Sequence, residues 1–596
     1  MVRNISFYII ASQILIIPLF FSMDKFSKIF LFSMVFLIFI LFRGKFFYNY
    51  KLLIISIFIL GLFSVSSLFN TGLYSFLFLF LLLIYGMSFL NFNNVDYTTN
   101  IFFKFYSVFI VVISLLGAYE FFSSLFLGAS NRMLIPYLLP KNNDLRVAGI
   151  YGQPNLFALV LLTGILVLLY LHLHSDDFFS MRFHVLKYLP YFTVASVFFL
   201  TGSRAGILAL MLTYLPLCWF VVRRRYLTKD SQRQQFVLLS GLLFLAYVLS
   251  YFLNWISPSV IVRHMGETGI SADARFVMWT SAILIFVDHP WFGVGLGNFK
   301  FYFPKYVNQA HDFLGFVPYE SMGHSNWAHN ELLQLLSEGG IFVFILLLLL
   351  LGFFIYQLYL YVLGRRQWSP LKLYSHMFLL PFFIQSMFSW PLRHPALLIL
   401  FFTFLGILLS QYSFTTMEVP RWGSMLLRIG AGCGMLLLML LGMQEIKMGS
   451  LVHNMDKANV QANFTDFAIL AAQPYSKYPI LAEMIPRYVP VALREHDVTF
   501  AGEILPYAKQ LVDLQGAHWQ WYSLALTYHV LDREKEARFS IDRAIELSPS
   551  HEIYWSFLHY LNMLKASRDT GRPVEEFYPN PPDGHYELPE IFRGNN

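Results

Sequence analysis

The sequence predicts an all-α protein: a polytopic transmembrane helix bundle of about 13 spans, followed by a smaller helical domain. Three observations lead to this fold class. Hydrophobic residues make up 57% of the 596-residue chain and charged residues only 13%, roughly half the charged share of a soluble domain. Near-continuous apolar runs long enough to cross about 30 Å of hydrocarbon recur as far as residue 443. From about residue 445 the chain becomes mixed-polar with helical periodicity.

The membrane core is predicted to occupy residues 1–444. Its first apolar run lacks a small-residue cleavage site and is followed at once by a second run, so we expect a retained helix. The predicted spans lie near residues 5–21, 26–42, 52–69, 73–90, 101–127, 154–172, 189–202, 205–222, 236–256, 340–363, 373–389, 396–411 and 424–443.

Lysine and arginine gather in three of the loops between spans, and this pattern predicts the orientation of the bundle. Short loops rich in these residues stay in the cytoplasm, so the N-terminus is predicted to lie inside. The outer face then receives the 128–153 loop, a large loop over 257–330, the 390–395 turn and the C-terminal domain. The loop cations are Arg43, Lys45 and Lys51, then Arg223, Arg224, Arg225, Lys229 and Arg233, and finally Arg365, Arg366 and Lys372.

Residues 445–570 are predicted to form a helical-hairpin domain like a tetratricopeptide (TPR) repeat. Ala501 and Ala508 lie 36 residues before Ala537 and Ala544, close to the length of about 34 residues of one repeat, which indicates an earlier, degraded repeat. The repeat pattern comprises Trp521, Leu524, Ala525, Tyr528, Ala537, Ile541, Ala544 and Pro549. A docking surface for a partner and a packing appendage without one both fit this domain. Residues 571–596 are expected to be an irregular tail.

Four polar clusters fall on the predicted outer face, and their convergence there is the main reason to expect a functional site. The first cluster, Ala148–Asn155, lies just before a span. Pro154 suits the first helical turn, where a missing N–H leaves no hydrogen bond unmade. Gln153 and Asn155 are then neutral hydrogen-bonding groups at the mouth of a helix. A plain helix-capping turn explains the same spacing.

The second cluster, Thr201–Gly206, places one arginine between two closely spaced spans. A lone arginine at a membrane boundary often only extends its charged end toward the headgroups. Here glycine and other small residues flank Arg204 on both sides, which allows close approach of a helix or of a ligand phosphate. Because guanidinium groups bind phosphate oxygens through two parallel hydrogen bonds, Arg204 is a candidate phosphate ligand.

The third cluster begins at Ser271 and contains Arg275. Ser271 or Asp273 is expected to cap a helix that ends before Pro290, with Arg275 in its first turn. An interfacial helix whose arginine is solvated explains the same pattern. The glycines at 293–297 do not make a nucleotide loop, because the Gly-Lys-Ser/Thr ending is absent and no strand precedes them.

The fourth cluster, His324–Gly340, is the most informative. Ser325 or Asn326 is a natural N-cap, which would set His329 in the first turn of a helix that enters the bilayer. A helix N-terminus disfavours imidazolium, so we expect His329 to stay neutral and able to accept a proton. A structural histidine satisfied by hydrogen bonds is the alternative. The polar stripe expected on this helix comprises Asn330, Glu331, Gln334, Ser337 and Glu338.

Several other chemistries are not expected. No Asp-x-Asp or His-x-x-x-His pair occurs on the predicted outer face, so we expect no metal and no other cofactor. The Gly-x-Ser-x-Gly elbow of serine hydrolases is absent. A net charge of +7 is explained by the cationic loops, and no soluble basic patch with interleaved aromatic residues indicates a nucleic acid partner.

The order and spacing of these motifs resemble the O-antigen ligase and polymerase superfamily of bacterial inner membranes. The resemblance covers about residues 145–410 and rests on Ser203-Arg204-Ala205-Gly206, Arg275-x-x-x-Trp279, the 288–299 stretch and the His329-Asn330 helix. Within that superfamily, Gly149-x-Tyr151-Gly152-Gln153-Pro154-Asn155 and His324-Ser325-Asn326-x-x-His329-Asn330 look most like the pilin-type protein O-oligosaccharyltransferases (PglL-like).

The resemblance implies an enzyme that transfers a preassembled glycan from undecaprenyl pyrophosphate to a Ser or Thr hydroxyl of a pilin-like protein in the periplasm. His329 would be the base, assisted by His324. The expected substrate-binding residues are Arg275, Arg204, Gln153, Asn155, Asn330 and Arg393. The transferases usually carry Glu-Tyr-Pro-Leu and a following Tyr at the next outer turn. This chain has Ser389-Trp390-Pro391-Leu392-Arg393-His394-Pro395 there, so Arg393 and His394 are expected to replace that function.

Two other functions fit parts of the pattern. An O-antigen ligase or polymerase would use a sugar hydroxyl of lipid A core or of another glycan as the acceptor. A transporter of lipid-linked glycans would also need spans and buried cations, but it should place paired charges near the middle of the bilayer or show broken helices. The clusters lie at one interface instead, which favours an enzyme embedded in membrane lipid.

Overall fold

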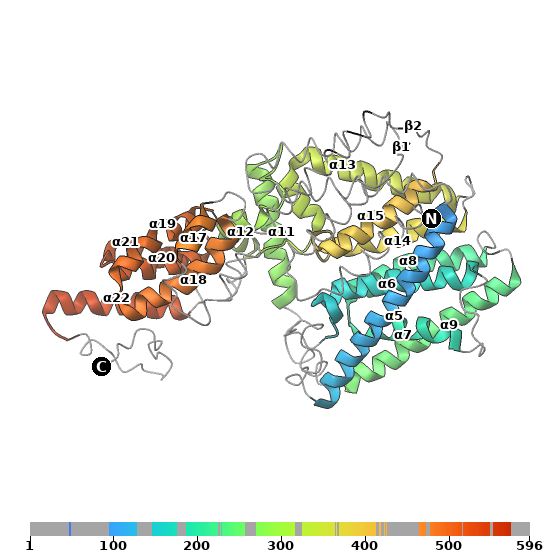
Figure 1. Ribbon diagram of the computed structural model, residues 1–596, viewed down its shortest axis with the longest axis horizontal. Helices are drawn as coiled ribbons and strands as arrows, with labels where there is room; N and C mark the ends of the chain where they lie inside the picture. The colour runs from blue at the N-terminus through green and yellow to red at the C-terminus, as the bar shows by residue number, and fades with distance from the viewer. Residues whose placement is uncertain are drawn as a thin grey trace.

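The computed structural model is helical throughout the part of the chain that it describes, apart from one pair of two-residue strands (Figure 1). The all-α fold class is therefore confirmed. The strand pair joins β1 (Phe47–Tyr48) to β2 (Met417–Glu418) in antiparallel order. The described residues are 47–48, 95–127, 146–175, 186–223, 227, 229–256, 270–315, 325–363, 365, 369–412, 417–418, 422, 425, 429, 464–472, 477–514, 516–548 and 552–573.

Apolar helices among the described residues correspond to predicted spans, and five are long and apolar enough to cross a membrane, as in a multi-pass membrane protein. The helices are α5 (Val95–Leu127), α6 (Pro154–His174), α7 (Leu189–Leu200), α8 (Arg204–Val222), α9 (Asp230–Ile256), α13 (Glu331–Val362), α14 (Pro370–Ser386) and α15 (Pro395–Ser410). The total of about 13 spans stays a prediction, because the runs before residue 95 and nearly all of 424–443 lie outside the described residues.

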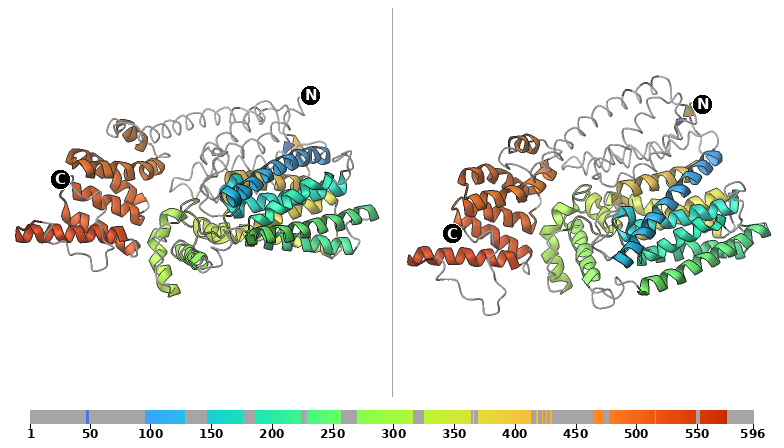
Figure 2. Two further views of the ribbon diagram at one scale, coloured as in Figure 1. Left: turned by 90° about the horizontal axis from the view of Figure 1, so that it is seen from below. Right: turned by 60° about the horizontal axis from the view of Figure 1, so that its bottom comes forward.

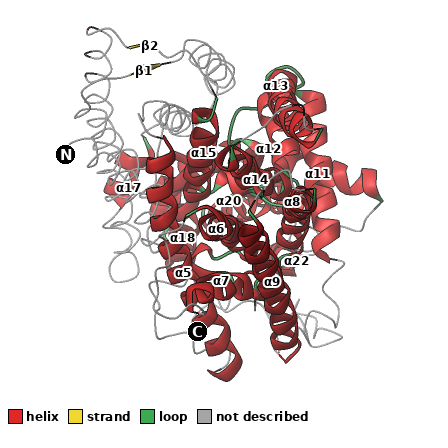
Figure 3. Ribbon diagram, turned by 90° about the vertical axis from the view of Figure 1, so that its right-hand side faces the viewer, coloured by secondary structure: helices red, strands yellow, loops and turns green. Residues whose placement is uncertain are grey.

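Helix α6 is the centre of the bundle, and α5, α7, α8 and α14 pack around it (Figure 3). Its sequence is apolar on every side, which is typical of a helix surrounded by other helices, and nearly all of its side chains are buried. The hydroxyl groups of Tyr106 on α5 and Thr163 on α6 share a 2.7 Å hydrogen bond. Because α6 carries Gln153 and Asn155 at its N-terminal end, this packing positions both groups.

The predicted outer loop over 257–330 contains two helices, α11 (Ile270–Asp288) and α12 (Phe299–Leu314). Helix α11 ends before Pro290, as expected. It begins at Ile270, however, so the predicted cap at Ser271 or Asp273 is wrong and Arg275 lies in the second turn rather than the first. The two helices pack against each other and against α13. The sequence analysis did not predict α12.

Helix α13 is interrupted at Gly340, where φ is 68° and ψ is −168°. The backbone that follows α11 fills the interruption. The carbonyl oxygens of Ser337 and Glu338 accept hydrogen bonds from Val294 N–H at 3.0 Å and Gly295 N–H at 2.8 Å, respectively. Opposite them, Ile341 N–H donates to the carbonyl oxygen of Pro290 at 2.8 Å. The glycine run of the third cluster thus exchanges backbone hydrogen bonds with a broken helix.

Close contact between the two backbones explains the glycines on both sides. A Cβ on Gly293 would lie 2.4 Å from the carbonyl carbon of Glu338, and a Cβ on Gly340 would lie 2.3 Å from the carbonyl oxygen of Trp291. Both glycines also have positive φ, which is the conformation that glycine adopts most readily.

The C-terminal region is a stack of helices in which each helix contacts the next (Figure 2). The small residues Ala501, Ala508, Ala537 and Ala544 of the predicted repeats are nearly fully buried at these contacts. Helical hairpins are therefore observed, whereas the TPR assignment stays a prediction. The helices are α17 (Phe464–Ala471), α18 (Lys477–Glu495), α19 (Val498–Leu514), α20 (His518–Val530), α21 (Glu534–Leu547) and α22 (Glu552–Thr570). Residues 574–596 of the expected tail lie outside the described residues.

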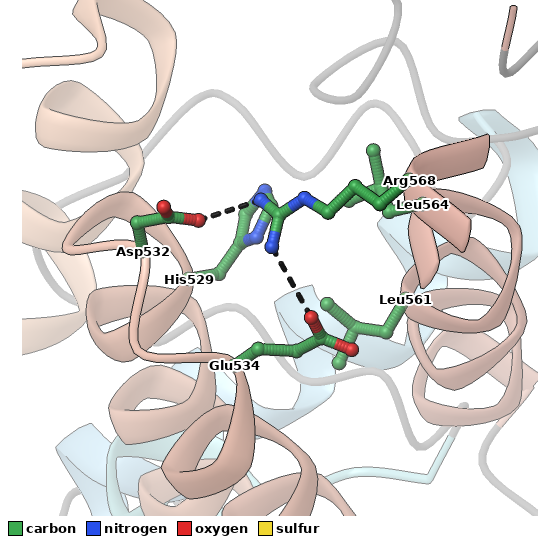
Figure 4. Close-up of a pocket in the computed structure, with 6 residues that line it drawn as sticks. All are labelled: His529, Asp532, Glu534, Leu561, Leu564 and Arg568. Carbon is green, nitrogen blue, oxygen red and sulfur yellow. Dashed lines mark hydrogen bonds and ion pairs between the residues drawn. The ribbon is translucent and has the colours of Figure 1, made fainter. Parts of the chain in front are cut away.

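Charged side chains fasten α22 to the turn between α20 and α21 (Figure 4). Arg568 donates to Asp532 at 2.6 Å and to Glu534 at 3.2 Å, beside His529. Exposed ion pairs contribute only about 0.2–1 kcal/mol each. These pairs are therefore expected to add little to the stability of the domain.

We predict that Gly340→Ala destabilises the folded chain, because the new Cβ meets backbone at a left-handed residue. The expected loss of unfolding free energy is at least about 2 kcal/mol, measured as a lower thermal midpoint of the full chain in detergent. Gly352→Ala in the same helix is the matched control, since no described heavy atom lies within 4 Å of its added Cβ. Equal midpoints for the two variants would contradict the backbone contact at the interruption.

Candidate active site

The polar clusters meet at one end of the bundle, where α6, α8 and α13 begin. Ser203 is the N-cap of α8, and its hydroxyl accepts from Gly206 N–H. The same hydroxyl donates a 2.8 Å hydrogen bond to Oδ1 of Asn155 in the first turn of α6. This bond joins the first two clusters. The assignment of this end to the periplasm stays a prediction.

A buried carboxylate holds the turn that precedes α6. Oε2 of Glu120 on α5 accepts hydrogen bonds from Ala148 N–H at 3.2 Å and Gly149 N–H at 2.7 Å. Gly149 has a φ of 52°, and a Cβ there would lie 2.7 Å from the ring of Phe157, so the turn requires glycine. The chain immediately before this turn carries Arg146 to the site.

Three arginines from separate segments form a cationic cluster. Arg146 precedes the turn before α6, Arg204 begins α8, and Arg275 lies on α11. Burial lowers the pKa of Arg275, and the positive charges of Arg146 and Arg204 lower it further. Guanidinium groups from three segments have the charge and the hydrogen-bond donors to bind a phosphate-type anion, which would offset their mutual repulsion.

His329 lies beside this cationic cluster with its backbone in the left-handed region. Its φ is 53°, which is uncommon for a residue with a side chain. Burial lowers the pKa of His329 to about 4, and the charge of Arg275 contributes to the same shift. The imidazole is therefore neutral at physiological pH and can accept a proton. The cause is burial and a neighbouring cation, whereas the sequence argument attributed neutrality to a helix N-terminus.

Helix α13 begins at Glu331 and not at Ser325 or Asn326, so the predicted N-cap is wrong. Asn330 is the N-cap, and its Oδ1 accepts hydrogen bonds from two N–H groups of the first turn, at 3.0 and 3.2 Å. Asn, Ser and Asp are similar as caps, so residue type alone did not select among them. His329 consequently precedes the helix instead of lying in its first turn.

The polar stripe of α13 faces the protein interior. The side chains of Gln334 and Glu338 are fully buried, and that of Glu331 nearly so. Arg393, in the short 3-10 turn η5 (Pro391–Arg393), donates to Glu331 at 3.0 Å and to Glu338 at 2.6 Å. Burial by itself lowers the pKa of Arg393, but the two carboxylates outweigh it and raise that pKa above its usual value. The buried Nη2 makes no hydrogen bond to the described residues.

Aromatic contacts tie the 390–394 turn to its neighbours on two sides. The rings of Trp327 and Trp390 stack with centroids 5.4 Å apart, and the rings of Tyr151 and His394 also lie 5.4 Å apart. The first cluster, the arginines, His329 and this turn therefore surround one region at the end of the bundle.

Comparison with known sequence families identifies the central part of the chain. Residues 189–348 match the O-antigen ligase family. This O-antigen ligase segment spans roughly a quarter of the chain, from α7 into α13, and it includes Arg204, Arg275 and His329. The match confirms the resemblance to the O-antigen ligase and polymerase superfamily. The pilin-type subtype stays a prediction. No curated protein matches the chain.

Of the remaining predicted site residues, one is exposed, two make hydrogen bonds within the protein, and one lies outside the described residues. Gln153 is exposed at the N-cap position of α6 and makes no capping hydrogen bond. Asn155 is engaged by Ser203, and Asn330 caps α13. His324 lies outside the described residues.

Two residues outside the O-antigen ligase segment were missed by the sequence analysis. Arg146 stands two residues before the first cluster, whose boundary was drawn too late to include it. Glu120 interrupts an apolar span, and ionisable residues within spans are rare and usually have a partner. That rule, applied to Glu120, would have indicated that a polar turn packs against α5.

We predict that Arg275→Gln raises the pKa of His329 above about 4, because the variant removes a neighbouring positive charge. Burial remains and is the larger cause, so the pKa should stay below its ordinary value of 6.5. Diethyl pyrocarbonate modifies neutral imidazole, so the pH dependence of its reaction with His329, measured by peptide mass spectrometry, reports this pKa.

The lowered pKa of His329 also links folding stability to pH. The stability contributed by neutral His329 is complete above pH 6.5 and is lost as pH falls toward 4.

Arg543→Gln, in the C-terminal domain, is the control for this titration. It removes an exposed arginine that pairs with Glu546, and it should leave the modification midpoint of His329 unchanged. A midpoint that does not move in Arg275→Gln would show that Arg275 and His329 are not electrostatically coupled.

Proposed function

We propose that the chain transfers a preassembled glycan from undecaprenyl pyrophosphate to an acceptor hydroxyl, at the outer face of the bacterial inner membrane. The family match over residues 189–348 supports glycan transfer in general. The observation that carries the proposal is a buried, neutral histidine beside Arg275, which in turn lies near Arg146 and Arg204. The histidine can take a proton, and the arginines can hold a pyrophosphate.

The cationic cluster would bind the pyrophosphate of the lipid-linked donor. Arg146 and Arg204 lie near enough to Arg275 for their charges to lower its pKa, and in the proposal all three contact the pyrophosphate. The pyrophosphate gains negative charge as the glycosidic C–O bond breaks, and a partly dry cationic site stabilises that charge. Because the arginines supply this positive charge, the proposed reaction is metal-independent.

His329 would take the proton of the acceptor hydroxyl as its oxygen bonds to the anomeric carbon of the glycan. The bond from that carbon to the pyrophosphate oxygen breaks, and undecaprenyl pyrophosphate leaves with the electron pair. A base with a pKa of about 4 is weak at neutral pH. The negative charge of a bound donor beside Arg275 would raise this pKa, so donor binding would strengthen the base in place.

Neutral side chains would complete the proposed site. Gln153 is available to orient the glycan or the pyrophosphate, since its exposed amide makes no capping hydrogen bond. Asn155 and Asn330 would support the site through Ser203 and through the cap of α13. His324 is proposed to assist the base or to position the acceptor.

A transporter of lipid-linked glycans is the second candidate, because α13 is broken and Arg393 pairs with buried carboxylates. The break is closed by protein, however. The carbonyl groups that the break frees accept hydrogen bonds from Val294 and Gly295. A transported ion or substrate would need such groups to remain open, so the closed break favours the enzyme.

The acceptor is proposed to be a pilin-like protein that docks on the C-terminal helices. Helix α12 contacts α21, and Asn308 donates to the carbonyl oxygen of Glu546 at 2.7 Å, so these helices lie against the core (Figure 1). A groove of about 380 Å³ between α19, α20 and α21 is lined by Trp521, Tyr528 and Phe539 together with two lysines. A tethered groove raises the local concentration of a weakly bound acceptor.

We predict that His329→Ala lowers transfer by about 10²- to 10⁴-fold, the usual contribution of a general base. The assay is co-expression with a lipid-linked glycan pathway and a candidate pilin, followed by mass spectrometry of the pilin and of the lipopolysaccharide. His559→Ala, which changes an exposed histidine on α22, is the control and should transfer normally. Normal transfer by well-expressed His329→Ala protein would remove His329 as the base.

We also predict that Arg275→Lys, Arg204→Lys and Arg146→Lys each impair transfer by about 10-fold. An ammonium keeps the charge but loses the planar, two-point phosphate contact, so the loss should be smaller than the 10²–10³-fold that follows removal of a donor. Arg233→Lys, where the arginine pairs with Asp230 at the other end of the bundle, is the control. Full activity in all three cluster variants would show that these arginines do not bind the donor.

A third prediction for this function concerns the acceptor. Phe539→Ser and Lys535→Glu should lower pilin glycosylation while the protein stays folded in the membrane, because both change exposed groups of the groove. Trp555→Ser changes an exposed aromatic residue outside the groove and should have no effect. A product on lipid A core with every pilin unmodified would identify an O-antigen ligase instead, and the transferase assignment would survive.

A further inference from the structure

A chain of hydrogen bonds leads from the backbone at His329 to the η5 turn. The N–H of Ala328 donates to Oε1 of Gln334 at 3.0 Å, and Nε2 of Gln334 donates to Oε1 of Glu338 at 3.0 Å. Oε2 of Glu338 accepts from Nη1 of Arg393 at 2.6 Å. Each member thus contacts the next, and the first contact is made one residue before His329.

Glu331 closes the chain into a loop. Its Oε2 accepts from Nε of Arg393 at 3.0 Å, and its Oε1 accepts from the N–H of Leu392 at 3.1 Å. Glu331 is also the first residue of α13, two positions after His329. Arg393 is therefore linked to the chain on both sides of His329.

Because these hydrogen bonds are buried, losing any one of them would cost free energy. Ala328, Gln334 and Glu338 are fully buried, and a buried polar group that loses its partner is left with the full cost of desolvation. The side-chain amide of Gln334 can serve both neighbours only when its oxygen faces Ala328 and its nitrogen faces Glu338. The carboxylate of Glu338 therefore determines the orientation of Gln334.

The backbone at His329 needs such support, because a residue with a side chain rarely adopts a left-handed φ unless its surroundings impose it. The N–H before it is held by Gln334, and the Asn330 cap holds the chain after it. The backbone is therefore held on both sides of His329, whose imidazole is influenced by the charge of Arg275.

We propose that Gln334, Glu338 and Arg393 form a positioning relay that holds His329 in its left-handed turn and so aims its imidazole at the reacting hydroxyl. The inference rests on the proposed function, in which His329 is the base. It assigns Arg393 to positioning within the protein, where its guanidinium joins the two carboxylates, and not to the glycan or the pyrophosphate. The relay residues contact no substrate themselves.

The distances also explain why position 393 is an arginine. Two carboxylates must be reached at once, at 3.0 and 2.6 Å, and a guanidinium offers separate nitrogens in a fixed plane. A lysine ammonium at this position would pair with one carboxylate and leave the other buried without its partner. The stacked rings of Trp327 and Trp390 join the same two segments, the chain before α13 and the η5 turn. The relay therefore connects segments that are also in contact through packing.

Steady-state kinetics of the full chain in membranes test the relay, with a native undecaprenyl-pyrophosphate-linked oligosaccharide as donor and purified pilin as acceptor. Gln334→Leu removes both hydrogen bonds at similar volume. It should lower kcat by about 10- to 100-fold, the effect of a small misplacement of a reacting group, and leave KM for the donor unchanged. Arg393→Lys should do the same to a smaller extent. Ser337→Ala is the control and should keep wild-type kcat, because among the described residues its hydroxyl bonds only to the carbonyl of Gln334 in the same helix.

An exchange of side chains separates positioning from loss of structure. Gln334→Glu alone places two carboxylates side by side and should lower kcat. The double variant Gln334→Glu with Glu338→Gln restores one donor and one acceptor between these positions, keeps an acceptor for Ala328, and preserves the buried charge. It should recover a measurable part of the kcat that Gln334→Glu alone loses, because the 334–338 hydrogen bond is restored. Recovery should be incomplete, because Arg393 then meets a neutral amide at position 338 and Phe299 N–H loses its acceptor there.

Three results would overturn the relay: wild-type kcat in Gln334→Leu, no recovery in the exchanged pair, or a raised KM with normal kcat in Arg393→Lys, which would make Arg393 a donor ligand. The rate at which diethyl pyrocarbonate modifies His329 at pH 7 is an independent readout. It should rise in Gln334→Leu as the turn loosens, and an unchanged rate would also count against the relay. If His329→Ala retains transfer, while the modification rate of His329 still rises in Gln334→Leu, the proposed base is wrong but the relay stands.

Discussion

Backbone hydrogen bonding at the interruption of α13 is the constraint on which the arrangement of the site depends. A helix in a membrane cannot leave carbonyl and N–H groups open to lipid. Ser337 and Glu338 therefore accept from the chain after α11, and Ile341 donates back to it. This exchange fixes α11 against α13, and so it fixes Arg275 relative to His329. Both segments of this contact require a glycine, at Gly293 and Gly340, because the two backbones touch.

Electrostatics then determine what this end of the bundle can do. Burial and the positive charges of Arg146 and Arg204 lower the pKa of Arg275, and three guanidinium groups in one region favour the binding of an anion. Burial keeps His329 neutral, and the positive charge of Arg275 contributes to the same shift in its pKa. The anion site and the proton acceptor therefore share one charged neighbour. Two buried carboxylates lie close by, but Arg393 engages both. The negative charge of the α13 stripe is thereby compensated by Arg393 and is not available to neutralise the arginines of the anion site.

The two parts of the molecule have complementary roles in the proposed reaction. The bundle holds a rigid site at the end of packed helices, with α6 buried on all sides. The C-terminal helices expose a groove lined by aromatic, basic and acidic side chains, and they contact the core through α12. The division would allow the chemistry to stay constant while the groove adapts to a different acceptor.

The sequence by itself determined the fold class, most described helices and the four polar clusters that contribute to the site. Apolar runs of span length and a shift to mixed-polar helical periodicity carry that information locally, residue by residue. It did not determine where α13 begins, that α12 exists, or that Arg146 joins the site. It also left Arg393 as an expected substrate ligand, although this guanidinium contacts two carboxylates. These features depend on contacts between segments far apart in the chain. Only the tertiary structure brings Gly293 to Gly340, Arg204 to Arg275 and Arg393 to Glu338, because their energies come from backbone contact and from charge at short distance, which no local pattern contains.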